Sequence, residues 1–176
     1  MKKISFAIIL AVIVTNVIQA QEAGIRFSNY EKEAEAGLNK FQVTDINGSA
    51  VTINNVNVKA VKDFSKSCKE AEDIHWYIQT NGTFVHYLMN GNKGRRCYDK
   101  KGNFVYNILS YPEEFLPYAV RDQVKRTYYF DYNIILADEI QTEGKTIYIV
   151  HIKNKTTWKN IRVCNGEMDV LEEFHE

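Results

Sequence analysis

Residues 58–89, VKAVKDFSKSCKEAEDIHWYIQTNGTFVHYLM, hold the pattern that decides the fold. Val61, Phe64 and Cys68 recur at the spacing of one helix face with lysines around them, which predicts an amphipathic helix. Residues 73–80 and 83–89 then alternate between apolar and polar side chains, as half-buried strands do. Asn81-Gly82 between them favours a two-residue hairpin turn. The stretch therefore predicts a helix followed by an antiparallel pair of strands.

The rest of the chain repeats this order. Two further strands are expected near 95–98 and 103–109, joined by the turn 99–102. Pro117 suits the first position of a second helix, on which Val120, Val124 and Tyr128 line one face. Asn165-Gly166 joins the last two of four more strands. These four strands are expected at 132–141, 145–153, 157–164 and 167–174.

This order predicts an α+β fold built as a tandem repeat, with repeats of about 58–110 and 111–176. Each repeat consists of a helix and four antiparallel strands. We expect both helices to pack on one face of a long antiparallel sheet and to leave the other face open.

The two hairpin turns predict which residues share a face. If Asn81-Gly82 is the whole turn, residues whose numbers sum to 163 lie opposite each other. One face then carries the pairs Ile74–Met89, Trp76–Tyr87 and Ile78–Val85, and the other carries His75–Leu88, Tyr77–His86 and Gln79–Phe84. The same rule at Asn165-Gly166 puts Ile161, Val163, Met168 and Val170 on one face, and Trp158, Arg162, Asp169 and Leu171 on the other.

The aromatic and polar face is the candidate binding surface, because recognition surfaces are enriched in aromatic groups with a few polar ones. Ordinary solvated strand residues are the alternative interpretation. The predicted binding residues are Tyr77, Phe84, His86, His75, Trp158 and Arg162.

These residues resemble a known family. The run Val61–Phe64, Trp76 and Tyr87, together with Asp99–Gly102, Leu116-Pro117 and Asn165-Gly166, looks like the beta-lactamase-inhibitor-like PepSY-like proteins, small exported proteins found largely in Bacteroidota. The resemblance spans about residues 58–174. It implies the fold of the beta-lactamase inhibitory protein, whose open sheet face grips an enzyme. It thereby implies protein binding or inhibition, while residues 21–57 are an addition to the family pattern.

The N-terminus predicts export. Lys2 and Lys3 precede an apolar run over 4–18, and a small residue at Ala20 suits cleavage, so 1–20 is expected to be a signal peptide. Residues 21–57 form a polar leader with a possible small hairpin around Asn47-Gly48. The domain follows at 58–176. We expect a periplasmic or secreted protein without a membrane span after cleavage.

Charge excludes one class of partner. The 22 basic and 22 acidic residues cancel, and removing Lys2 and Lys3 leaves a slight acidic excess. A chain without a basic excess is a poor ligand for phosphate backbones, so no nucleic acid is expected. The predicted partner is an exported protein or peptide.

Cysteines and histidines give no metal or cofactor prediction. The three cysteines permit one disulfide, for which Cys68 and Cys97 are the candidates, with reduced thiols as the alternative. Cys97 and Cys164 are expected on strands four apart, too far for a bridge. His75 and His86 are predicted to be offset diagonally, which leaves only a weak surface metal site. Asp99 and Gly102 resemble a fragment of a calcium loop, but a tight turn accounts for them better.

Catalytic motifs are absent from the sequence: it has no nucleophile elbow, metalloprotease helix or phosphate-binding glycine loop. The sequence therefore predicts a non-catalytic binding protein. A periplasmic small-ligand or calcium-responsive sensor is the first alternative. An unrecognised hydrolase is the second.

Overall fold

The computed structural model describes residues 41–44, 56–128 and 131–175. The predicted signal peptide, most of the leader and the Asn47-Gly48 turn lie outside these ranges, so those predictions stay open. The strand β1, Phe41–Thr44, pairs in parallel with β2.

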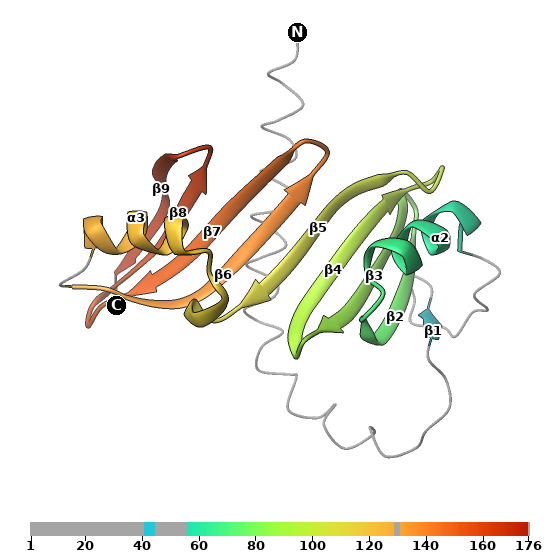
Figure 1. Cartoon of the computed structure of the whole chain (residues 1–176), viewed down its shortest axis with the longest axis horizontal. Coiled ribbons are helices and arrows are strands. Elements are labelled where there is room, and N and C mark those ends of the chain that lie inside the picture. Colours follow the sequence, from blue (N-terminus) through green and yellow to red (C-terminus); the bar gives the residue numbers. More distant parts are fainter. Residues whose placement is uncertain (1–40, 45–55, 129–130, 176) are drawn as a thin grey trace, which may run out of the picture. The chain divides into compact units, whose positions relative to one another are not determined.

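Nine strands of the described residues form one sheet, in which the spatial order follows the chain from β1 to β9 (Figure 1). Apart from β1, all neighbours pair antiparallel. The elements after β1 are α2 (Val58–Ser67), β2 (Glu72–Gln79), β3 (Gly82–Met89), β4 (Asn92–Asp99), β5 (Phe104–Tyr111), the 3₁₀ helix η3 (Glu113–Phe115), α3 (Tyr118–Tyr128), β6 (Asn133–Thr142), β7 (Lys145–Lys153), β8 (Thr157–Cys164) and β9 (Glu167–His175).

Both helices begin close to where the sequence predicts. The Asn57 side chain caps α2 by accepting the Lys59 N–H at 2.9 Å, which satisfies one free donor of the first turn. The second helix begins at Tyr118, one residue later than expected. Pro117 precedes it, and its carbonyl accepts the Arg121 N–H at 3.0 Å.

Asn-Gly turns set the register of two hairpins. Asn165 (φ 53°) and Gly166 (φ 79°) both have positive φ, and Cys164 lies opposite Glu167 as the sum rule predicts. The pairing continues regularly to Ile161 and Val170, and a bulge interrupts it beyond them. Asn90-Gly91, which the sequence analysis missed, forms the same kind of turn between β3 and β4.

The β2–β3 register differs from the prediction by two residues. The turn is Thr80-Asn81, and Gly82 is already paired with Gln79, so Trp76 lies opposite Val85 and Tyr77 opposite Phe84. Gly82 enters the strand because a Cβ there would lie 2.1 Å from the Tyr98 carbonyl oxygen, a close approach that only glycine permits. A shift of two residues keeps every side chain on its predicted face.

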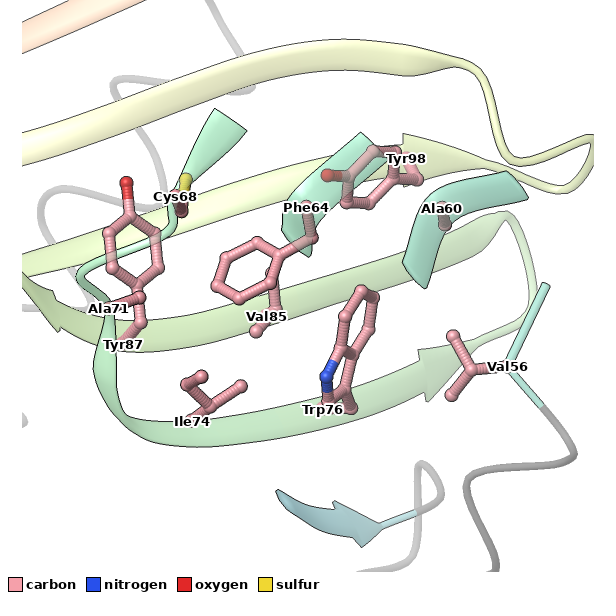
Figure 2. Packing of buried hydrophobic residues seen from close by; sticks show 10 residues of the cluster. All are labelled: Val56, Ala60, Phe64, Cys68, Ala71, Ile74, Trp76, Val85, Tyr87 and Tyr98. Carbon is pink, nitrogen blue, oxygen red and sulfur yellow. The ribbon is translucent and has the colours of Figure 1, made fainter. Parts of the chain in front are cut away.

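Residues of α2 pack against one end of the sheet (Figure 2). The Phe64 ring meets the edges of Trp76 and Tyr87, with centroid distances of 5.4 Å and 5.3 Å. Trp76 also stacks on Tyr98 at 6.0 Å. Burying each such side chain contributes about 1.5–3 kcal/mol, so this cluster fixes α2 to β2–β4.

A second cluster combines α3 with the other half of the sheet. Val120 and Val124 pack with Ile152, Ile161 and other buried strand residues. The pairing places both clusters on one face, which we call the helix face, and we call the opposite side the second face. The helix face bears Trp76, Val85, Arg96, Asn107, Ala137, Val150 and Ile161, and the second face bears Tyr77, Phe84, Cys97, Tyr106, Ile140, Ile149 and Arg162.

Gly94 is predicted to be intolerant of a side chain. A Cβ there would lie 2.2 Å from the ring of Tyr87, which is buried and whose hydroxyl donates to Asn107 at 2.7 Å. We expect Gly94→Ala to lower the free energy of unfolding by about 1–3 kcal/mol through overpacking, measured by urea denaturation. In a Tyr87→Leu background the same methyl group should cost much less. Equal losses in both backgrounds would contradict this explanation.

Candidate functional site

Three of the predicted binding residues form a compact aromatic cluster on the second face. The rings of Tyr77 and Phe84 stack with centroids 4.8 Å apart. The His86 ring lies 5.0 Å from Tyr77 and 5.1 Å from Phe84. All three side chains are half-buried, so part of each ring is accessible. We call these three residues the aromatic cluster.

His75 adjoins this cluster more closely than predicted. It lies directly opposite His86, and not diagonally, because of the two-residue change in register. The His75 Nε2 atom lies 2.7 Å from the Asp73 carboxylate, which a bulge and a positive φ of 49° bring beside it. Within the described ranges, no group of three or more His, Cys, Asp or Glu side chains is arranged to hold a metal ion.

The electrostatics of the cluster favour a neutral His86. Burial, reinforced by the charge of Arg95 and by His75, lowers the pKa of His86 to about 4. The Arg95 guanidinium lies over the Tyr106 ring, 5.7 Å from its centroid. At pH 7 this part of the second face therefore combines apolar rings with the positive charge of Arg95, and Lys93 lies two residues along β4 on the same face.

Trp158 and Arg162 lie elsewhere on the second face. Both are on β8, five strands from β3, which corresponds to about 24 Å across the sheet. The Lys153 ammonium lies 4.4 Å from the centre of the Trp158 ring. Arg162 donates to the Asp169 carboxylate on β9. The structure thus does not join these two residues to the aromatic cluster.

The middle of the second face is apolar and buried, with Ile108, Ile140, Ile147 and Ile149 all under 10% exposed. The predicted binding residues lie on either side of these isoleucines, at the two flanks of the face. The flank with the aromatic cluster carries four of the six predicted binding residues, so it is the stronger candidate.

A network of hydrogen-bonded polar side chains crosses five strands of the second face, and the sequence analysis missed it. We call it the His151 network. The His151 Nε2 atom lies 2.9 Å from the Asp138 carboxylate, and its Nδ1 lies 2.7 Å from the Asn160 side-chain oxygen. Asn160 donates its amide N–H to Glu172 at 2.6 Å, which fixes the amide oxygen toward His151. Ser110 donates to the other oxygen of Asp138. Because both ring nitrogens of His151 face acceptors, the geometry suits the doubly protonated imidazolium.

Burial and polar contacts act in opposite directions on the pKa of His151. Its side chain is 6% exposed, and such burial alone opposes the charged form. The hydrogen bond and charge of Asp138, with Asn160 and Glu172, outweigh burial and raise the pKa of His151 above its ordinary value of 6.5.

The His151 network is not a nucleophilic triad. A triad needs the base between the nucleophile and the orienting acid, so that the base can take the proton of the hydroxyl. Here the Asp138 carboxylate lies between Ser110 and His151 and binds both. The arrangement can hold a charge in place, but it does not activate Ser110.

The three cysteines are free thiols. The bridge between Cys68 and Cys97 that the sequence left open is not formed, because the two lie on opposite sides of the sheet. Cys68 packs in the cluster with Phe64, whereas Cys97 pairs with Phe84 on the second face. Burial raises the pKa of both thiols.

The Asp99 segment is a tight turn. One carboxylate oxygen of Asp99 accepts the N–H groups of Lys101 and Asn103 at 2.8 Å, and the other accepts the Asn103 amide at 2.8 Å. Gly102 completes the turn with φ 76°. The Asp99 carboxylate oxygens are thus engaged by the turn itself. This agrees with the sequence interpretation of residues 99–102 as a tight turn.

No helix in the described ranges has the length and apolar character that spanning a membrane requires.

Neither a family model nor a curated protein matches the sequence. Solved structures do match. A BLIP-like protein from Bacteroides fragilis superposes with a TM-score of 0.55 at 15% identity, covering 68% of this chain and 86% of its own.

Two DUF2874 family proteins give the same result. The protein from Bacteroides uniformis has a TM-score of 0.53 at 16% identity and covers 67% of this chain and 88% of its own. The protein from Bacteroides ovatus has a TM-score of 0.55 at 12% identity, with 69% and 88% covered. At these identities the likeness concerns the fold, and the PepSY part of the predicted resemblance stays a prediction. The chain therefore has the BLIP-like fold that its sequence predicted, shared with DUF2874 family proteins of Bacteroides.

Proposed function

We propose that this chain is an exported, non-catalytic binding protein that holds another exported protein or peptide on the second face. The observation that carries the proposal is the stacked, half-exposed aromatic cluster of Tyr77, Phe84 and His86. Such rings present large, rigid contact surfaces at little entropic cost, which is why binding sites concentrate them. Binding that blocks the partner's activity would make the chain an inhibitor.

The arrangement of the helices supports this use of the second face. α2 precedes β2–β5 and α3 precedes β6–β9, an order that agrees with a tandem duplication. Residues of both helices join clusters on the helix face, so in this proposal the second face is the one left for a partner. The family that the sequence resembles implies the same use, because the beta-lactamase inhibitory protein grips its enzyme with its open sheet face.

Export and the lack of catalysis rest on the sequence and on the site. The predicted signal peptide at 1–20 and the absence of catalytic motifs motivate both. In the structure, the Ser110–Asp138–His151 order does not provide a base for the serine. No described arrangement favours the calcium-responsive alternative.

The test is cross-linking capture from the native cell envelope, followed by measurement of the purified pair. We expect Tyr77→Ala/Phe84→Ala/His86→Ala to abolish binding of the captured partner, with a melting temperature close to that of the wild type. A matched control removes Phe115 and Tyr118, which are 52% and 77% exposed and lie in η3 and α3. Trp158→Ala tests the other flank separately.

Two results would contradict the proposal. If the triple variant binds the purified partner as tightly as the wild type and the Phe115/Tyr118 control, the aromatic cluster is not the binding site. If the triple variant unfolds at a much lower temperature, the three rings act mainly in stability.

A further inference from the structure

Arg95 differs from every other arginine in the described part of the chain. The other four each contact a carboxylate: Arg96 with Asp63 at 2.8 Å, Arg121 with Glu113 at 2.7 Å, Arg126 with Asp122 at 3.0 Å, and Arg162 with Asp169. Arg95 has no carboxylate within ion-pair distance among the described residues, and its recorded contact is with the Tyr106 ring. Within the described ranges, its charge is thus not compensated by an ion pair beside the aromatic cluster.

Among the described residues, none of those directly opposite Arg95 is acidic. In the register, His86 lies opposite Arg95 on one side and Ile108 on the other. The row on one side is Phe84, Cys97 and Tyr106, and the row on the other side is Glu72, Leu88, Lys93 and Ser110. The nearest acidic side chain along β2 is Asp73, which binds His75. With the pKa of His86 lowered to about 4, Arg95 is the positive charge nearest the aromatic cluster at neutral pH, and the exposed Lys93 lies two residues along β4 on the same face.

A partner that covers this flank must compensate the charge of the Arg95 guanidinium. Arg95 is already half-buried, and removing the remaining water without a counter-charge costs several kcal/mol. A carboxylate offsets that cost, because its two oxygens match the planar fork of a guanidinium in a bidentate pair. Tyr106 beneath the guanidinium limits its orientations, which favours this geometry.

The apolar part of the flank is at a fixed spacing from Arg95. Arg95 pairs with His86, and Cys97 pairs with Phe84, so the Arg95 position and the Phe84–Tyr77 stack are two residues apart along the strands. Phe84 is on the neighbouring strand, so the Arg95 and Phe84 positions are about 8 Å apart, close to the roughly 7 Å between side chains i and i+2 on one side of an extended peptide.

We infer that this flank recognises an extended acidic segment of an exported protein, with an Asp or Glu seated on Arg95 and a large apolar side chain two residues away on the Phe84–Tyr77 stack. The inference rests on the proposed function and adds the chemistry of its partner. It makes Arg95 a specificity-determining residue that the sequence analysis did not select.

The test uses capped heptapeptides with Glu-Ser-Phe or Phe-Ser-Glu at the centre, since the segment can run in either direction. Each peptide is compared with two control peptides, one with Gln in place of Glu and one with Ser in place of Phe. Titration of the purified protein is followed by NMR. We expect one of the two peptides that carry both Glu and Phe to bind at least about tenfold more tightly than its Gln control peptide. The difference should be smaller in 0.5 M NaCl.

Variants then locate the preference. Arg95→Gln should abolish the discrimination between Glu and Gln, and Arg95→Lys should keep part of it, because it keeps the charge without the fork. Arg162→Gln is the matched control on the same face and should leave the discrimination intact. Because Arg95 makes no ion pair within the described ranges, both Arg95 variants should melt close to the wild type.

The outcomes separate this inference from the proposed function. Equal binding of Glu and Gln peptides, a preference that survives Arg95→Gln, or no peptide binding at millimolar concentration would each overturn the acidic-segment inference. None of them decides the proposed function, which depends on the aromatic-cluster variant and its purified partner. Loss of discrimination in Arg162→Gln alone would place the acidic contact on the other flank and would also overturn the inference.

Discussion

Phe64→Ala is expected to lower the free energy of unfolding by about 3–5 kcal/mol, the range for removing a buried aromatic ring. Phe64 is 1% exposed and is the residue of α2 that contacts both Trp76 and Tyr87 (Figure 2). Its loss leaves a cavity between the helix and the sheet, with no neighbouring element free to fill it. Urea denaturation followed by circular dichroism measures the change.

Two variants make this expectation specific. Val58→Ala shortens a residue of the same helix that is 65% exposed, and it should change stability by less than about 0.5 kcal/mol. Ile161→Ala removes a buried residue from the second cluster, which shares no member with the first. The losses from Phe64→Ala and Ile161→Ala should therefore add. A loss below about 1 kcal/mol for Phe64→Ala would show that the helix does not depend on this contact.

His151→Leu is the second substitution with a large expected effect. It leaves the Asp138 carboxylate buried, with Ser110 as its remaining side-chain partner, and breaking such a pair costs about 3–5 kcal/mol. Replacing both members of the pair removes the uncompensated charge. The Asp138→Leu/His151→Leu double variant should therefore lose less stability than the sum of the two single variants.

The same pair predicts a dependence on pH. The pKa of His151 is raised above 6.5 in the folded protein, so its stabilisation is complete below the unfolded value of about 6.5 and is lost as the pH rises through the folded pKa. His86 acts in the opposite direction at lower pH. Because its folded pKa is about 4, protonation of the unfolded chain costs stability as the pH falls from 6.5 toward 4.

Denaturation curves at several pH values distinguish these two histidines. In His151→Leu, the decline in stability above pH 6.5 should disappear, whereas His86→Ala should flatten the profile only between about 4 and 6.5. An unchanged decline above pH 6.5 in His151→Leu would exclude His151 as its source.

Alternation and turn chemistry made the elements and faces of this chain predictable. The strand pattern around Trp76 and Val85 identified the buried side of β2 and β3 even though the register was wrong by two residues, since such a shift does not move a side chain to the other face. The register itself depends on the close approach of Gly82 to the Tyr98 carbonyl, a contact between strands that no dipeptide reveals.

The His151 network was not predictable in the same way. Asp138, His151 and Asn160 come from three strands, and their alignment depends on the registers of β6 with β7 and of β7 with β8. One signal was present in the sequence. His151 follows Ile149-Val150 and precedes Ile152, and a polar group inside such an apolar run needs a buried partner. Arg95 was missed because its distinction is that no carboxylate of the described residues pairs with it, which only the structure can show.

The order of the strands also bears on how the chain folds. Each strand from β3 to β9 pairs with the one that precedes it in the chain, through short connections except where η3 and α3 intervene. Contacts between neighbours in sequence need little loop closure, and sheets of this kind form faster than sheets whose strands exchange order. A chain with this strand order can therefore assemble one hairpin after another, starting from its N-terminal strands.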